Sequence, residues 1–210
     1  MLEWVQYAKF FAALLAIANP IGAIPVFIGL TEGMPAYRRH NTARMAATAV
    51  AIVLLVALFT GESILGFFGI TIASFRVGGG ILILLIAVSM MHAKISPAQQ
   101  TDEEAQDAVA KESVAVVPLA IPLLAGPGAI STIIVNTARS HELAHRLMLG
   151  AEILLMAVLI WLVLSIAPLL ARRLGRTGIN VLTRIMGLIL AAIAVEFMAS
   201  GLRQLLPGLA

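Results

Sequence analysis

Six long apolar runs constrain the fold of this 210-residue chain more than any other feature. An α-helix rises about 1.5 Å per residue, so about 20 consecutive apolar residues cross the roughly 30 Å hydrocarbon core of a bilayer. Only 12% of the residues are charged, against about 25% in a typical soluble domain. The sequence therefore predicts an all-α, polytopic membrane protein with six transmembrane helices. The runs cover residues 8–30, 44–61, 67–91, 114–136, 147–171 and 179–202.

Several function classes are excluded by residues that the chain lacks. It has no cysteine, which excludes disulfides, thiolate metal sites and cysteine nucleophiles. It has no HExxH, GxSxG or Walker motif and no pair of carboxylates at catalytic spacing. The net charge of +3 is spread over short loops and forms no clustered basic face. We expect no enzyme activity, no cofactor, no metal and no nucleic-acid partner.

The basic residues predict an orientation in the membrane, because short loops rich in lysine and arginine favour the cytoplasm. The loops after the first, third and fifth spans are the more basic, which places both termini outside the cytoplasm. The acidic loop 93–113 then becomes a cytoplasmic linker, with a regulatory or partner-binding role as the alternative. The cytoplasmic set is Arg38, Arg39, Arg44, Lys94, Lys111, Arg172, Arg173 and Arg176, and the opposite set is Lys9, Arg139, Arg146 and Arg203.

The two halves of the chain resemble each other. Residues 18–24 and 125–130 both read Ala-x-Pro-(x)-Gly-Ala-Ile, with their prolines 107 residues apart. Placing Arg76 on Arg184, a shift of 108, aligns a second stretch. Each half holds three spans, an odd number, so the second half enters the membrane from the opposite side. This predicts two inverted three-helix repeats, an architecture common in secondary transporters. The predicted units are 1–92, the linker 93–113, and 114–210.

Prolines and glycines interrupt the first and fourth spans near mid-depth. Proline removes a backbone donor, and glycine leaves helical geometry at low cost. Unwound backbone is tolerated inside a membrane only where it contacts protein or lines a watery cavity. The freed N–H and C=O groups can bind carboxylates and cations. We therefore predict broken helices 1 and 4 that form a paired substrate site, with simple proline kinks as the alternative. The interrupting residues are Asn19, Pro20, Gly22 and Pro25, then Pro118, Pro122, Gly126, Pro127 and Gly128.

Neutral polar side chains and small residues accompany both interruptions, which favours a small zwitterion as the guest. The alternative for each small residue is close helix packing. Ionisable residues inside spans are costly and often functional, so we expect coupling or gating roles for Glu196, Arg76 and Arg184. Their alternatives are a structural ion pair and snorkelling to the interface. Glu62, Glu152 and His92 are predicted to be interfacial. The predicted substrate-binding residues are Asn19, Pro20, Gly22, Ala23, Gly126, Pro127, Gly128, Ser131 and Thr132, with Asn136 nearby.

Three stretches make the sequence resemble the MarC family: "ANPIGAIPVFIGLTEG" (18–33), "FRVGGGILILLIAVSMM" (75–91) and "PLAIPLLAGPGAIST" (118–132). The resemblance implies a six-span protein of the bacterial inner membrane. Some members, the SnatA-like branch, are described as transporters of small neutral amino acids such as glycine and alanine. By analogy, Asn19-Pro20 and Gly126-Pro127 would lie at the transport site.

Together these features predict a secondary transporter of small neutral amino acids that works by alternating access around a midplane site. On family grounds export is expected over uptake, driven by substrate exchange or by an ion gradient, with protons as the candidate coupling ion. The alternatives are a channel or exporter for other small solutes, and a membrane scaffold that transports nothing. Besides substrate, the predicted partners are protons and membrane lipid.

Overall fold

A computed structural model describes residues 4–31, 33–92 and 124–209 of the chain, and all of its regular structure there is helical. The predicted linker 93–113, with Lys94 and Lys111, and the start of the fourth span, with Pro118 and Pro122, lie outside the described residues. The elements are α1 (Trp4–Ala18), α2 (Ile24–Leu30), α3 (Ala36–Phe67), α4 (Ile72–Met91), α6 (Pro127–Thr137), α7 (Leu143–Ser165), α8 (Ala167–Leu205) and a final 3-10 turn, η2 (Pro207–Leu209).

Within the described residues, four stretches are long and apolar enough to cross a membrane: α3, α4, α7 and the Thr177–Leu205 part of α8. Their outward faces remain apolar, as the exposed fractions of Ile52 (56%), Leu154 (53%) and Leu188 (66%) illustrate. Such a surface is unfavourable in water and favourable in hydrocarbon. These helices confirm an all-α polytopic membrane protein.

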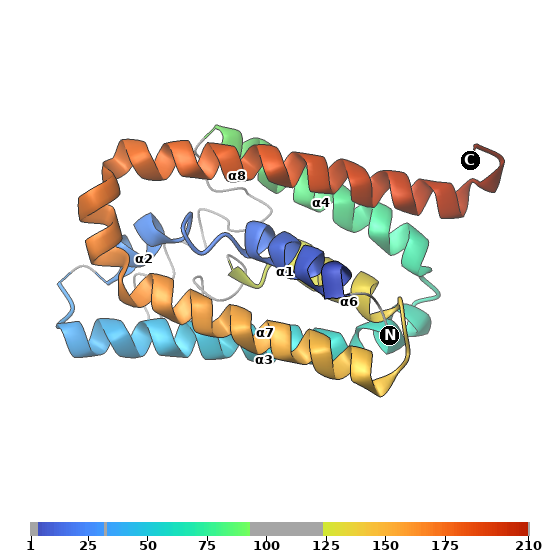
Figure 1. Cartoon of the computed structure of the whole chain (residues 1–210), viewed down its shortest axis with the longest axis horizontal. Helices are drawn as coiled ribbons and strands as arrows, with labels where there is room; N and C mark the ends of the chain where they lie inside the picture. Colours follow the sequence, from blue (N-terminus) through green and yellow to red (C-terminus); the bar gives the residue numbers. More distant parts are fainter. Residues whose placement is uncertain (1–3, 32, 93–123, 210) are drawn as a thin grey trace.

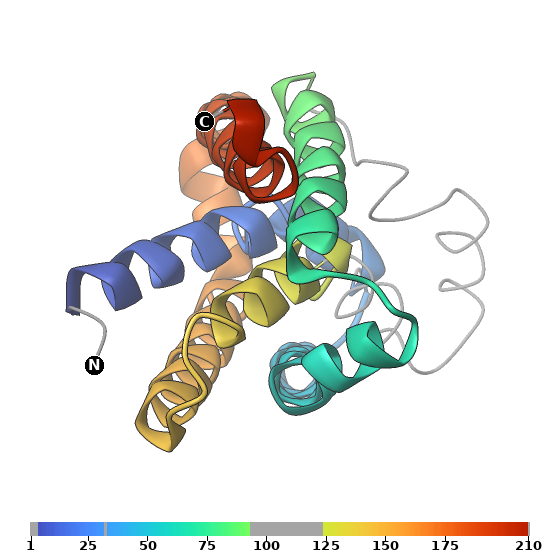
Figure 2. The same cartoon turned by 90° about the vertical axis from the view of Figure 1, so that its right-hand side faces the viewer.

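The long helices form two pairs, with α1 and α6 between them (Figures 1 and 2). One pair is α4 with α8, and the other is α3 with α7. The antiparallel α3–α7 pair is joined at one end by Arg146 Nη2, which lies 3.3 Å from Glu62 Oε2. At the other end, the His40 ring packs edge-on against Trp161, with ring centroids 5.4 Å apart.

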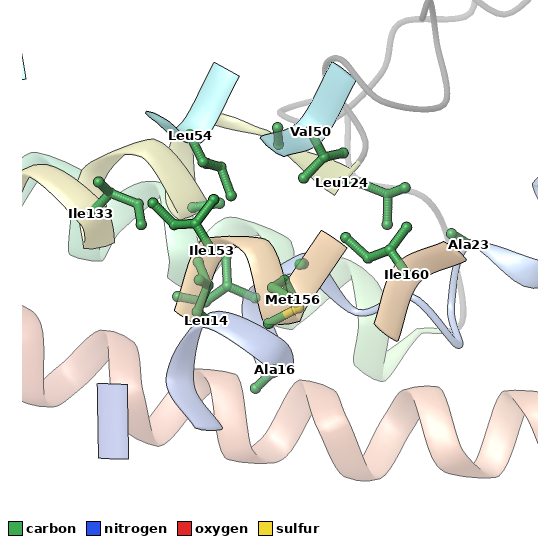
Figure 3. Close-up of a cluster of buried hydrophobic side chains, with 14 of the residues drawn as sticks. Leu14, Ala16, Ala23, Val50, Leu54, Leu124, Ile133, Ile153, Met156 and Ile160 are labelled. Carbon is green, nitrogen blue, oxygen red and sulfur yellow. The ribbon is translucent and has the colours of Figure 1, made fainter. Parts of the chain in front are cut away.

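The interior is apolar and is shared by both interrupted segments. Leu14 of α1, Leu54 of α3, Ile133 of α6 and Ile153 of α7 are fully buried and meet in one cluster (Figure 3). Because α1 and α6 contribute to this core, their broken ends lie in the protein interior and not on its lipid-facing surface.

Two of the predicted basic loops are helical, which corrects the sequence analysis. Arg38, Arg39 and Arg44 lie in the first turns of α3, which begins at Ala36. With 32 residues, α3 is roughly 48 Å long and exceeds the hydrocarbon core, so its polar end extends beyond the apolar run.

The fifth span also ends earlier than expected, at Ser165 instead of residue 171. Helix α8 begins directly at Ala167, because Pro168 falls in its first turn, where the missing N–H costs no hydrogen bond. Arg172 and Arg173 are therefore part of a helix. The chain then changes direction at Gly175, whose backbone angles are φ 63° and ψ 178°.

Replacing Gly175 with alanine should destabilise the protein by about 1–3 kcal/mol, because this backbone region is strained for any residue with a Cβ. Gly66 provides the control, since it lies in α3, and a Cβ there would meet nothing within 4 Å. Gly66→Ala should instead raise stability by up to about 1 kcal/mol, the helix-propensity difference between the two residues. Thermal unfolding in detergent measures both changes, and equal shifts would contradict the assigned kink.

Candidate functional site

The predicted interruption of the first run is present. Helix α1 ends at Ala18, and Asn19 takes the left-handed conformation with φ 42°. Pro20 then lacks the N–H that a continuing helix would donate to the carbonyl of Ala16. The Asn19 side chain replaces part of the lost pairing: its Oδ1 accepts a hydrogen bond from the Gly22 N–H at 3.2 Å. Asn19 is therefore a local cap of the break.

The residues predicted to form the second interruption, Gly126, Pro127 and Gly128, lie at the start of α6. Gly126 is extended, with ψ 176°, and Pro127 occupies the first turn of the helix. Helix geometry leaves the N–H groups of Gly128 and Ala129 without intrahelical acceptors. Gly128 is buried so tightly that a Cβ there would lie 3.2 Å from Cγ2 of Ile17. The last turn of α1 thus packs against the first turn of α6.

Helix α4 contacts both interruptions. The Asn19 Nδ2 lies 3.9 Å from the sulfur of Met90. On the α6 side, a Cβ on Gly79 would lie 2.7 Å from Cβ of Ser131, so these two backbones approach closely. The structure therefore brings both groups of predicted substrate residues together against one helix.

The predicted site is closed in this conformation. Thr132 Oγ1 donates to the Gly128 carbonyl at 2.9 Å, and Asn136 Nδ2 donates to the Thr132 carbonyl at 2.8 Å. Both side chains thus satisfy carbonyls of their own helix. Asn19, Gly22 and Pro127 are half-buried, and the remaining predicted substrate residues are buried: Pro20, Ala23, Gly126, Gly128, Ser131 and Thr132.

A cavity of about 640 Å³ adjoins α2, immediately beyond the first interruption. Pro25 and Gly29 line it on one side, and Gly175 and Asn180 on the other. Arg39 lines both this cavity and a neighbouring one of about 560 Å³. Its Nε is buried and has no hydrogen-bond partner within the part of the chain that the structure describes.

The three charged residues predicted for coupling or gating lie in different environments. Arg76 is buried, with 8% exposure, and its Nη1 donates to Ser200 Oγ at 2.7 Å. Arg184 and Glu196 are exposed on α8. A role for any of them stays a prediction, and the different burial of Arg76 and Arg184 argues against treating them as equivalent positions.

Helices α4 and α8 approach closely at several glycines, two of which, Gly80 and Gly187, make matching contacts. A Cβ on Gly80 would lie 3.0 Å from one backbone oxygen and 3.1 Å from one backbone nitrogen of α8. A Cβ on Gly187 would lie 3.0 Å from both an oxygen and a nitrogen of the α4 backbone. The first contact involves the Ala194 oxygen and the Met198 nitrogen, and the second involves the Ala87 oxygen and the Met91 nitrogen.

One buried polar group was missed by the sequence analysis. His145, 3% exposed, lies between the Tyr7 hydroxyl, 3.0 Å from its Nδ1, and the Asn136 carbonyl, 2.8 Å from its Nε2. A usable signal was present, because His145 shares its helical face with the buried Leu149 and Ile153.

Comparison with known proteins agrees with this architecture. The family model described as "MarC family integral membrane protein" matches residues 4–206. The chain is 46% identical to the UPF0056 membrane protein YhcE of Escherichia coli over 99% of this chain and 96% of that protein. It is 42% identical to a UPF0056 membrane protein of Methanocaldococcus jannaschii, over 92% and 94% of the two chains.

A third relative, the UPF0056 membrane protein YvbG of Bacillus subtilis, is 38% identical over 94% of both chains. No solved structure matches. Since the family model and these relatives each cover more than nine-tenths of the sequence, the chain belongs to the MarC family of integral membrane proteins.

Proposed function

We propose that this protein is a secondary transporter of small neutral amino acids, with its substrate site where the end of α1 meets the start of α6. The observation that carries the proposal is the contact of the end of α1 with the start of α6 inside the protein, at Ile17 and Gly128. Interrupted helices with paired ends are the usual construction of midplane sites in secondary transporters. Transport of this kind needs no cofactor and no covalent step.

The helix ends that meet carry opposite partial charges, which suits a zwitterion. The C-terminal end of α1 presents carbonyl oxygens and the negative end of its dipole. The N-terminal end of α6 presents the N–H groups of Gly128 and Ala129 and the positive end of its dipole. A substrate ammonium would bind at the first end and a carboxylate at the second.

The residues around this meeting point favour a very small guest. Four buried alanines flank the two interruptions, so little volume is available for a substrate side chain. Glycine and alanine satisfy this limit, whereas leucine does not. The four are Ala18, Ala23, Ala125 and Ala129.

Reciprocal contacts between α4 and α8 support the inverted repeat. A pseudo-two-fold axis requires that each contact recur with the partners exchanged. Gly80 of α4 contacts Ala194 and Met198 of α8. Adding 107 to Gly80 gives Gly187 of α8, and subtracting 107 from its two partners gives Ala87 and Met91 of α4. These are the residues that Gly187 contacts, so the same contact recurs with the helices exchanged. The same shift separates Pro20 from Pro127.

The burial pattern supports a shift of 107 instead of the 108 that aligned Arg76 with Arg184. One residue of slippage rotates a helix by about 100°. With 107, the buried Gly80, Ile83 and Ala87 correspond to the buried Gly187, Leu190 and Ala194. Arg76 then corresponds to Thr183, which accounts for the exposed position of Arg184.

In the proposed cycle, the structure represents a state whose site is closed and whose cavity faces the predicted cytoplasmic end. Arg39 offers a cationic group there for a substrate carboxylate entering from that side. Export would begin from this cavity.

Purified protein in liposomes tests the function. We expect exchange of radiolabelled glycine at a rate at least tenfold above protein-free liposomes, inhibited by unlabelled alanine and not by leucine. Flux no greater than in empty liposomes would contradict the proposal. Equal inhibition by leucine and by unrelated solutes would instead favour a general channel or exporter.

A further inference from the structure

A buried chain of hydrogen bonds joins α1, α6 and α7 at the end of the molecule opposite the cavity. It runs from the Tyr7 hydroxyl to His145 Nδ1, at 3.0 Å, and from His145 Nε2 to the Asn136 carbonyl, at 2.8 Å. Tyr7 is 8% exposed and His145 is 3% exposed. Histidine is the side chain whose protonation changes most readily near neutral pH, so a buried, bonded histidine between three helices can link protonation to their arrangement.

The partners of His145 determine where its protons lie. A carbonyl oxygen can only accept, so Nε2 carries a hydrogen and donates it to Asn136. In neutral His145, the Nδ1 lone pair therefore accepts the hydroxyl hydrogen of Tyr7. Binding a proton places a second N–H at Nδ1, and the Tyr7 hydroxyl hydrogen must then turn to another acceptor.

Two carboxylates associated with α7 bear on this change: Glu142 directly precedes the helix, and Glu152 lies within it. Both Glu142 and Glu152 act electrostatically on the Tyr7 hydroxyl. Oε2 of Glu152 is buried and has no hydrogen-bond partner among residues 4–31, 33–92 and 124–209.

Other charged groups surround this end of the bundle without entering the chain. Three of them lie on or beside α1, α4 and α8: Lys9 is exposed on α1, Arg76 is on α4, and Arg203 is in the last turn of α8. The others lie near the start of α7: Arg139 follows α6, and His141 and Arg146 lie beside Glu62 of α3. His141 differs clearly from His145, because the side chain of His141 is 75% exposed whereas His145 is 3% exposed.

Helix α6 connects this chain to the proposed substrate site. It has 11 residues, so it is roughly 16 Å long, and nine of the 11 are buried. Asn136 lies near its C-terminal end, and Pro127 and Gly128 form its first turn. A rearrangement that moves the Asn136 end of this short, enclosed helix also displaces the first turn.

We propose that His145 is the proton-binding residue of the transport cycle, and that its protonation rearranges the Tyr7 link between α1 and α7 and shifts α6 at the substrate site. This inference rests on the proposed transport function. It assigns the coupling ion as the proton and locates the group that binds it. In the orientation predicted from the basic residues, that group lies toward the outer face.

His145→Gln is the matched test, because the glutamine amide keeps a donor at the position of Nε2 but cannot be protonated near neutral pH. In wild-type proteoliposomes, each imposed pH unit should change glycine accumulation up to about tenfold per coupled proton. In His145→Gln, glycine accumulation driven by the pH gradient, divided by the glycine exchange rate, should fall to the value measured without a gradient. His141→Gln, at the exposed histidine, should retain the full gradient response.

Tyr7→Phe should shift the pH profile of transport, whereas Tyr37→Phe, at an exposed tyrosine, should not.

A full gradient response in His145→Gln would overturn the inference. If wild-type protein exchanges no glycine at all, the proposed function fails separately.

A second measurement uses the wild-type protein and is independent of the variants' folding. In nitrogen-15 histidine NMR spectra of the protein in nanodiscs at a fixed pH, adding glycine should change the protonated fraction of the buried imidazole. An imidazole that stays neutral throughout the range in which histidine titrates, with and without glycine, would also overturn the inference.

Discussion

Replacing Gly80 with leucine is expected to prevent stable packing of α4 against α8 and to abolish the folded protein. A Cβ at this position would lie 3.0 Å from the Ala194 oxygen and 3.1 Å from the Met198 nitrogen. Both are backbone atoms, which cannot move aside as the end of a flexible side chain can. Overpacking of a core commonly costs about 1–3 kcal/mol, and with an entire leucine against backbone we expect at least the upper end of that range.

Gly78 supplies the control within the same three-glycine stretch. It is exposed, and a Cβ there would meet nothing within 4 Å. Gly78→Leu should therefore leave the melting temperature unchanged or raise it, because leucine favours a helix more than glycine does. Size-exclusion chromatography and thermal melting in detergent measure the difference. Similar melting temperatures for the Gly78 and Gly80 variants would show that the close α4–α8 approach is not needed for folding.

Gly187→Leu extends this prediction to the proposed repeat. Its contacts with Ala87 and Met91 match those of Gly80 in distance and atom type. If the two halves are related by a pseudo-two-fold axis, the two substitutions should destabilise the protein to a similar degree. A Gly187→Leu protein as stable as wild type would argue against equivalent positions.

The class of fold and the first helix break were predictable from sequence because each depends on local physics. The length of an apolar run indicates directly whether a helix can cross the membrane. The Asn19-Pro20 pair interrupts a helix wherever it occurs, because proline lacks the backbone N–H. The full extents of α3 and α8 were not predictable from hydropathy. Arg38 lies before the run 44–61 and Arg172 follows the run 147–171, yet arginine is a good helix former, so both residues are helical.

The pairing of the helices and the side-chain contacts of the site could not be predicted from sequence, because both depend on tertiary structure. Nothing local distinguishes Arg76, buried against Ser200, from the exposed Arg184, because the difference is which helical face meets a neighbour. The helical spacing of His145 from Leu149 and Ile153 indicates a buried face, but its contacts with Tyr7 and Asn136 come from tertiary structure alone. A substrate role for Asn19 stays a prediction, and the capping of its own break by Asn19 Oδ1 is a tertiary detail that the sequence did not indicate.

Asn19→Leu is expected to reduce glycine exchange by roughly 10- to 100-fold, the largest effect on transport that the structure predicts. Leucine loses the acceptor for the half-buried Gly22 N–H, which costs about 1 kcal/mol, the lower end of the range for a buried unpaired amide. It also strains the left-handed backbone at φ 42°, which costs a further 1–2 kcal/mol or so. These two costs disfavour the native geometry of the break, in which the substrate site forms. Since 1.4 kcal/mol is about a factor of ten in rate, they account for the predicted loss of glycine exchange.

Asn19→Gly separates the two contributions, because glycine accepts the positive φ but offers no side-chain acceptor. Exchange should therefore decrease in the order wild type, Asn19→Gly, Asn19→Leu. Asn41→Leu, at an exposed asparagine in α3, serves as the control and should exchange glycine at the wild-type rate. Each rate is compared at equal amounts of monodisperse protein, so that a loss of folding is not counted as a loss of transport. Folded Asn19→Leu protein with wild-type exchange would mean that the geometry of the first interruption does not form the substrate site, and the proposed meeting of α1 and α6 around a zwitterion would have to be abandoned.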